Sequence, residues 1–177
     1  MMNKTFKFDN TSIWKYFIKI LLNTIFIYLI TLTCLILYFN IKDLNLILKL
    51  VTLLLIFGWF LVFGFPLFIL YFNHRKYSKD AIFKIENNIF FYSNKNQSLN
   101  FKFEDIQKIE LWLTPPKFNK TTDWQYFGKY HFTSIYLKGN KIINISCLVF
   151  DETLIVFPKE FIKRKKKFFP IMKKSVV

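Results

Sequence analysis

The chain has 177 residues, which is enough for one domain or for a small domain plus a second element. It is 53% hydrophobic and 21% aromatic, with 24 Phe, and yet it carries a formal net charge of +15. This combination is unusual for a soluble protein and excludes an even mixture of apolar and basic residues along the chain.

The charges are divided near residue 75. Six of the 26 basic residues precede Phe72, and the other twenty lie from Arg75 onward together with nine acidic residues. The first part is therefore apolar, and the second part carries a net charge of about +11 by this count. The two cysteines, Cys34 and Cys147, show no motif spacing and lie in different environments. We expect both to be free thiols.

Two uncharged runs dominate the first part, at residues 20–39 and 50–72. About 20 apolar residues in a helix cross the hydrocarbon core of a bilayer, and a helix that is apolar on every face is rare in a soluble domain. The first run is too long for the apolar region of a signal peptide, and no small-residue cleavage site follows it. The sequence therefore predicts two transmembrane helices.

The connection between these helices, residues 40–49, is too short for a domain and predicts a helical hairpin. Basic residues flank the outer ends of the hairpin: Lys4, Lys7, Lys15 and Lys19 before it, and Arg75, Lys76 and Lys79 after it. Because positively charged flanks stay on the cytoplasmic side, both termini are expected in the cytoplasm.

Short alternating segments separated by turn residues begin at Ala81. They predict strands at 81–86, 89–93, 99–103 and 104–113, followed by a hairpin over 130–150. Asn87–Asn88 is expected to turn the first pair, and Gly139–Asn140 tolerates the positive φ of a tight turn in the last. Six or more such strands predict a small antiparallel barrel or sandwich.

The end of the chain, "KEFIKRKKKFFPIMKKS" at 159–175, has a helical period. At 100° per residue, Phe157, Phe161 and Phe168 share one face. The opposite face holds Lys159, Lys163, Arg164, Lys166 and Lys167, and only Lys165 intrudes on the apolar side. An amphipathic helix that starts near Pro158 and closes the β domain is therefore predicted.

Several stretches support a resemblance: "FKFEDIQKIELW", "YLKGNKIINISCLVF" and the closing "KKFFP". With the two apolar runs before them, they resemble the bacterial PH-like membrane proteins, the group that includes the YcxB-like family. The resemblance implies a PH-like barrel on a membrane hairpin in the bacterial cytoplasmic membrane. Biochemical function is largely unassigned in that group, so the resemblance implies architecture rather than activity.

We thus expect two parts, a tail with a hairpin at 1–76 and a cytoplasmic PH-like β domain with a C-terminal helix at 77–177. His74 and His131 have no carboxylate or cysteine nearby at metal-ligand spacing, and Ser134 and Cys147 have no evident base. We therefore expect no catalytic, cofactor or metal site, and no enzymatic activity.

Two kinds of residue are candidates for binding. Basic residues beside a bilayer attract anionic lipid, and exposed aromatics form hot spots for protein partners. The candidates are Arg75, Lys76, Lys79, Lys163, Arg164, Lys166 and Lys167, together with Trp124 and Tyr126 in the aromatic loop. The alternative for the loop aromatics is packing in the barrel core.

These observations leave two functions open. One is a membrane-anchored binding or scaffold protein that engages anionic headgroups, a protein partner, or both. The other is an accessory subunit of a larger membrane complex, or an immunity-type inhibitor, that packs its helices against another integral protein. Nucleic-acid binding is not expected because the membrane anchor disfavours it, and homo-oligomerisation is left open.

Overall fold

The computed structural model describes residues 3–9, 11–38, 44–95, 97–123, 128–151 and 153–177. The chain forms two compact units. One unit, here called the β domain, comprises Met1–Asp9 and Ile69–Val177, and the other, the helical insert, is Asn10–Phe68. The β domain thus includes the N-terminal residues and starts again before residue 77, where the sequence suggested a boundary.

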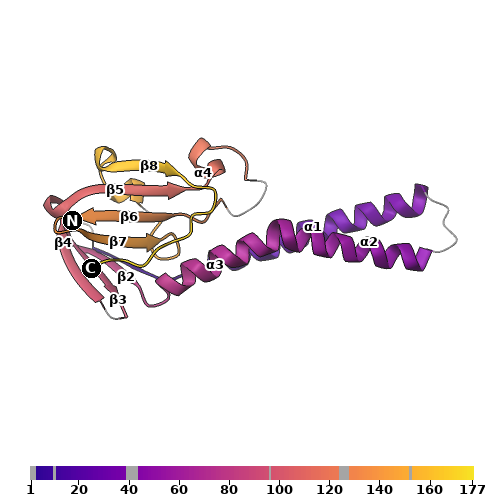
Figure 1. Ribbon diagram of the computed structural model, residues 1–177, viewed down its shortest axis with the longest axis horizontal. Helices are drawn as coiled ribbons and strands as arrows, with labels where there is room; N and C mark the ends of the chain where they lie inside the picture. Colours follow the sequence, from indigo (N-terminus) through magenta and orange to yellow (C-terminus); the bar gives the residue numbers. More distant parts are fainter. Residues whose placement is uncertain (1–2, 10, 39–43, 96, 124–127, 152) are drawn as a thin grey trace. The chain divides into compact units, whose positions relative to one another are not determined.

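Two four-stranded sheets make up the β domain (Figure 1). The first has the order β1-β2-β3-β4, with every pair antiparallel. Its strands are β1 (Lys4–Lys7), β2 (Ile82–Glu86), β3 (Ile89–Asn94) and β4 (Gln97–Lys102). The second has the order β7-β6-β5-β8 and consists of β5 (Ile106–Leu113), β6 (Phe132–Leu137), β7 (Lys141–Ser146) and β8 (Ile162–Lys166).

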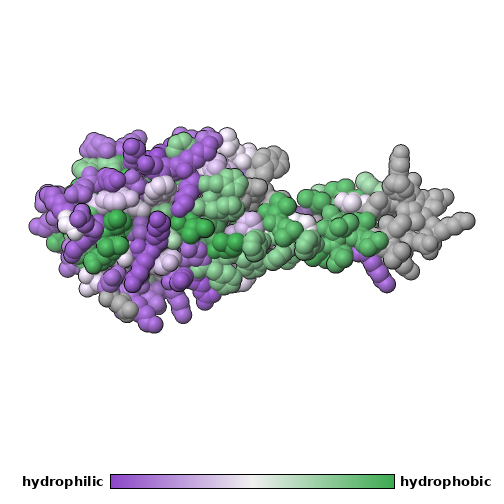
Figure 2. Space-filling model, viewed as in Figure 1, coloured by the Kyte–Doolittle hydropathy of each residue, from purple (hydrophilic) through white to green (hydrophobic). Residues whose placement is uncertain are grey.

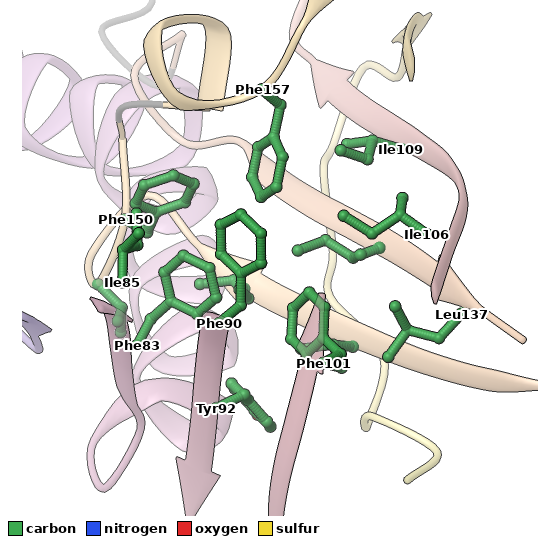
Figure 3. Packing of buried hydrophobic residues seen from close by; sticks show 14 of the residues in the cluster. Phe83, Ile85, Phe90, Tyr92, Phe101, Ile106, Ile109, Leu137, Phe150 and Phe157 are labelled. Carbon is green, nitrogen blue, oxygen red and sulfur yellow. The ribbon is translucent and has the colours of Figure 1, made fainter. Parts of the chain in front are cut away.

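Aromatic and aliphatic side chains from both sheets fill the space between them (Figure 3). Phe83, Phe90 and Phe101 come from the first sheet, and Ile109 and Ile135 come from the second. Alternation along each strand directs these residues inward, as expected for a sandwich. The sandwich predicted from the sequence is confirmed.

The two expected tight turns are present. Asn87 and Asn88 have φ values of 49° and 66°, and Gly139 and Asn140 have values of 77° and 59°. Two successive residues with positive φ match the right-handed twist of the strands that they join. These turns therefore set the register of β2 with β3 and of β6 with β7.

Strand β1 was not predicted, because residues 4–7 looked like part of a tail. In the structure Lys7 pairs with Ile82, so β1 and β2 are neighbours although the helical insert separates them in the sequence. Phe6 packs edge-on against Phe150 with ring centroids 4.9 Å apart, and the Asp9 amide donates to the Leu148 carbonyl. The helical insert therefore interrupts the first sheet between two adjacent strands.

The helical region contains α1 (Thr11–Tyr38), α2 (Leu44–Trp59), a π-helical segment (Phe60–Gly64) and α3 (Phe65–Ser78). The last ten residues of α3 belong to the β domain. Within the insert, the Tyr28 and Thr52 hydroxyls lie 2.9 Å apart and link α1 to α2.

The π-helical segment ends two residues before Pro66. Proline has no N–H and its ring crowds the preceding turn, so the regular helical hydrogen bonds cannot continue through it. Here the Phe65 amide donates to the Phe60 carbonyl, five residues earlier. The wider turn absorbs the proline and lets the helix continue into α3.

Apolar side chains of the helical insert are largely exposed, including Phe26, Leu53, Leu54 and Phe57. Figure 2 shows apolar surface over α1 and α2 and mostly hydrophilic surface over the β domain. Among the described residues, the continuous helix Leu48–Ser78 is long and apolar enough to cross a bilayer, and Leu21–Cys34 is a shorter apolar stretch.

The predicted C-terminal amphipathic helix is wrong. Lys159–Phe161 forms a 3-10 turn, and Ile162–Lys166 is strand β8, which runs parallel to β5. The open edge of β5 offers unpaired backbone groups, and an edge position tolerates a run of lysines. A helical projection cannot detect this tertiary pairing, whose last hydrogen bond joins the Lys167 amide to the Leu113 carbonyl at 2.8 Å. The second sheet is consequently mixed rather than purely antiparallel.

Candidate functional site

The β domain contains a pocket of about 500 Å³ beside β5 and β8. It is also lined by residues of two short helices, α4 (Pro115–Asn119) and α5 (Thr153–Val156). Its apolar walls are Leu111, Leu113, Leu154 and Ile162, and its polar lining residues are Lys117, Lys120, His131, Asp151, Thr153, Lys159 and Arg164. A volume of this size is typical of small-molecule sites.

Four lysine and arginine side chains line this pocket, and they come from three separate segments. Lys117 lies on α4, and Lys120 follows that helix with a left-handed backbone (φ 58°). Arg164 on β8 donates to the Lys117 and Phe118 carbonyls at 3.3 and 3.0 Å. This contact caps the end of α4 and fixes the helix beside β8, because terminal helix carbonyls lack partners within the helix.

His131 and Asp151 form the other end of the pocket. His131 is buried, and its Nε2 lies 2.7 Å from the Asp151 carboxylate. Burial alone lowers the pKa of His131, but Cys147 and Asp151 outweigh it and raise that pKa to about 9. Charged His131 donates from Nδ1 to the Lys129 carbonyl at 2.8 Å.

Lys117 lies 2.9 Å from the same Nδ1 atom of His131. A protonated imidazole has no free lone pair, so it cannot accept a hydrogen bond from an ammonium group. The neighbouring protein acceptor for Lys117 is Asp151, at 3.5 Å, which already binds His131. The Lys117 ammonium is therefore poorly satisfied by these two neighbours.

Cys147 faces His131 across the β6–β7 hairpin, where the Cys147 amide donates to the His131 carbonyl at 3.0 Å. Burial raises the pKa of the Cys147 thiol, but the imidazoles of His131 and His74 outweigh it and hold that pKa below its ordinary value. No base for Cys147 was evident from the sequence alone. Counting outward from the predicted Gly139–Asn140 turn places His131 opposite Cys147. The strand register was therefore the sequence feature that could have identified this pair.

His74 is fully buried at the end of α3, inside the β domain. Its ring nitrogens lie 2.8 Å from Ser146 Oγ and 2.9 Å from the Pro170 carbonyl. Next to it, the Met172 amide donates to Asn73 Oδ1 at 2.7 Å. These contacts fix the last part of α3 to β7 and to the C-terminal segment.

The basic residues expected near the end of the helices lie where α3 ends. Arg75, Lys76 and Lys79 are exposed. Arg75 also lies over the Tyr71 ring, 5.8 Å from its centroid. These residues remain open to solvent and can reach an external anion.

The basic run on β8 does not form one face. Alternation along a strand sends Lys163, Lys165 and Lys167 to one side of the sheet and Arg164 and Lys166 to the other. Arg164 accordingly reaches α4 and lines the pocket, whereas Lys165 and Lys167 lie over the Trp112 ring, 5.9 and 5.6 Å from its centroid. The structure therefore separates residues that the helical projection grouped together.

Glu110 anchors the outer side of this sheet. It accepts hydrogen bonds from Tyr136 at 2.9 Å and from Lys108 at 3.2 Å, and Lys165 lies 3.9 Å away. Burial raises the pKa of Glu110, but these donors outweigh it and lower that pKa overall. This network neutralises part of the basic run and indicates a structural contribution from Lys165.

Trp124 and Tyr126, expected in an aromatic partner-binding loop, lie outside the described residues. Of the nearby aromatics, Trp112 stacks on Phe132 with centroids 5.9 Å apart, and Tyr130 is buried. Lys117, Lys120 and Lys159 were not among the candidate binding residues, because only the tertiary fold brings their segments together. Within the described residues, no group of three or more His, Cys, Asp or Glu is arranged to hold a metal ion.

Comparison with known proteins gives one match. The sequence model of a family described as a PH domain matches residues 5–156, a range that includes most of β1, the helical insert and α5. No curated protein and no solved structure shows a significant match to the chain.

Proposed function

The chain belongs to the PH domain family, and from this premise we propose that it is a membrane-anchored, non-enzymatic binding protein. In this proposal the helical insert crosses a bilayer twice, and the basic β domain lies at the surface of that bilayer. There it engages anionic headgroups, a protein partner, or both. The proposal also places the chain among the bacterial PH-like membrane proteins related to the YcxB-like family, in the cytoplasmic membrane with both termini in the cytoplasm.

The pairing of β1 with β2 carries this proposal. Lys7 and Ile82 pair in one sheet, so the chain leaves the β domain and returns to it at neighbouring positions. Both ends of the intervening segment must therefore lie on the same side of any bilayer that it crosses. This requires an even number of crossings, which agrees with the two apolar runs at 20–39 and 50–72.

The surface of the helical insert supports the same reading. Large side chains such as Phe26, Leu54 and Phe57 are each more than half exposed. Apolar surface on this scale is costly in water, and lipid tails remove that cost. The Tyr28–Thr52 hydrogen bond joins the two helices within this apolar surface, as polar contacts do between membrane helices.

The charge of the β domain suggests what it engages. Each basic residue close to an anionic bilayer contributes roughly 1 kcal/mol to attraction. Arg75 and Lys76 lie in the last turn of α3 and Lys79 follows it. All three are exposed, as are Lys163 and Lys166 on β8. Arg164 and Lys167 are less suitable, because Arg164 caps α4 and Lys167 donates to the Ile171 carbonyl at 3.1 Å.

Membrane integration and topology test the proposal together. The full chain should stay in the pellet when bacterial membranes are washed with alkaline carbonate. In a background of Cys34→Ser and Cys147→Ser, Lys102→Cys should react with an impermeant maleimide in inverted vesicles, and Lys49→Cys should react in intact spheroplasts. Release by carbonate, or labelling of both positions from the same side, would contradict the proposal.

Headgroup contact has its own test. Replacing Arg75, Lys76 and Lys79 with Gln should reduce photo-crosslinking of the β domain to phosphatidylglycerol in nanodiscs, while the matched triple variant at Lys84, Lys102 and Lys138 should not. Equal crosslinking in the two variants would argue against a lipid-facing role for the end of α3 and in favour of a protein partner.

A groove in the helical insert favours a second candidate function, that of an accessory subunit or immunity-type inhibitor. Its volume is about 560 Å³, and Leu21, Thr24, Gly58 and Val62 are among its lining residues. A Cβ atom at Gly58 would meet nothing within 4 Å, so the groove is open there. Small residues allow another membrane helix to approach closely. Gly58→Leu should then abolish co-purification of a stoichiometric integral partner, whereas Leu53→Ile should not.

A further inference from the structure

We propose that the pocket between β8, α4 and α5 binds an amphiphilic anion, meaning a phosphate or carboxylate group joined to a short apolar chain. The proposal goes beyond attachment of the β domain to a membrane surface. It concerns a ligand held inside the domain, whether or not the helical insert crosses a bilayer.

The charge distribution of the pocket defines the polar half of the ligand. Four lysine and arginine side chains line it in addition to His131, and among its described lining residues Asp151 is the one carboxylate. Asp151 is already bound to His131 at 2.7 Å. The excess positive charge in a partly enclosed space attracts an anion and repels a metal cation.

Specific donors are available for that anion. Lys117 is poorly satisfied by His131 and Asp151, and the side chains of Lys120 and Lys159 make no ion pair among the described residues. Oxygen atoms of a phosphate or carboxylate accept such charge-assisted hydrogen bonds, which are stronger than neutral ones. The lysines come from α4 and from the turn before β8, so an anion between them would join two segments.

The walls of the pocket define the apolar half. Leu111, Leu113 and Ile162 lie behind the lysines, and Leu154 is 51% exposed beside them. An inorganic anion would leave this apolar surface in contact with water, whereas an alkyl chain would cover it. The described lining includes no Phe, Tyr or Trp side chain, and the imidazole of His131 is held by Asp151 and the Lys129 carbonyl, so the pocket is poorly suited to stack a nucleobase.

The experiment uses the full chain in a nonionic detergent and three probes: hexyl phosphate, inorganic phosphate and hexanol. Isothermal titration should give saturable binding of hexyl phosphate, at least about tenfold tighter than that of inorganic phosphate or hexanol. Absence of saturable hexyl phosphate binding would overturn the proposal.

Two pairs of variants locate the binding. Lys120→Gln with Lys159→Gln should weaken hexyl phosphate binding about tenfold or more, whereas Lys102→Gln with Lys138→Gln removes the same charge elsewhere and should not.

Leu154→Gln should weaken binding of hexyl phosphate but not of phosphate, and Ile155→Gln, on the same helix but outside the pocket lining, should change neither. All six of these residues lie at exposed positions, so the substitutions should preserve folding. Equal effects of a pocket pair and its control would overturn the proposal.

A separate binding measurement in nanodiscs distinguishes the two sources of such a ligand, a bilayer lipid and a free amphiphile. In nanodiscs that contain phosphatidylglycerol, loss of hexyl phosphate binding relative to phosphatidylcholine nanodiscs would identify a bilayer lipid as occupant. Equal binding in both would identify a free amphiphile. Either result supports the pocket, and neither depends on the topology of the helical insert.

Discussion

Phenylalanine occurs in opposite environments in the two units. In the β domain, Phe83 and Phe90 are completely buried and stack on each other, with ring centroids 6.0 Å apart. In the helical insert, Phe26 and Phe57 are 65% and 59% exposed. The same side chain thus forms a core in one unit and a surface in the other. Exposed apolar surface is costly in water, so the exposed phenylalanines of the insert favour an apolar partner, which we propose to be lipid.

The largest expected effect tests the core side of this comparison. Phe90 packs against Phe101, Phe103 and Phe157 with centroids 4.8–5.2 Å apart. Phe90→Ala should lower the free energy of unfolding of the β domain by about 3–5 kcal/mol, because it leaves a cavity. Urea unfolding of the full chain in micelles, followed by near-ultraviolet circular dichroism, measures this loss.

Phe57→Ala is the control for that measurement, since it removes the same atoms from an exposed position in the insert. It should leave the unfolding transition of the β domain unchanged. A similar loss of stability in both variants would show that the two units do not differ in the way that burial indicates.

The second prediction tests the insert side. Leu61 in the helical insert and Leu154 in the β domain are 49% and 51% exposed. Leu61→Lys should reduce the carbonate-resistant fraction, because a lysine near the centre of a membrane helix costs about 2.5–3.5 kcal/mol. Leu154→Lys should leave that fraction unchanged. Equal behaviour of the two variants would mean that the surroundings of the two leucines are alike.

The sequence was sufficient where local pattern and structure agree. Asn87–Asn88 and Gly139–Asn140 form the turns that their residue types favour, and the alternation after Ala81 does correspond to strands. It failed where tertiary pairing decides the structure. Residues 4–7 form a strand only because β2 offers an edge for pairing. Residues 162–166 form a strand only because β5 offers another.

The pocket could not be predicted for a related reason. Lys117 and Lys120 are distant in the sequence from Lys159 and Arg164, and only the parallel pairing of β8 with β5 brings these segments together. A helix at 159–175 would have placed Arg164 among the solvent-facing lysines. As a strand, the same residue turns toward α4 and the pocket.

A third prediction concerns the part of α3 that belongs to the β domain. His74→Leu should destabilise the β domain by about 1–3 kcal/mol, because it leaves Ser146 and the Pro170 carbonyl without this buried partner. Phe72→Leu, two residues earlier and exposed, should have little effect. Urea unfolding checks both, and an unaffected His74→Leu variant would place this stretch of α3 outside the cooperative unit.

The smallest expected effect on stability concerns His131, since its partner Asp151 is 65% exposed and exposed ion pairs contribute little. Burial lowers the pKa of His131, but Cys147 and Asp151 raise it from 6.5 to about 9. A pKa that is raised in the folded state stabilises that state fully below the unfolded value. This contribution is therefore present below pH 6.5 and is lost as the pH rises through about 9.

Asp151→Asn should accordingly move the pKa of His131 toward its ordinary value and weaken the decline of stability on the alkaline side. Glu104→Gln, which removes an exposed carboxylate elsewhere in the β domain, should leave the titration unchanged. Nuclear magnetic resonance of the His131 ring protons between pH 5 and 10 follows the titration directly. An unchanged His131 pKa in the Asp151→Asn variant would mean that Cys147 alone holds the charge on this imidazole.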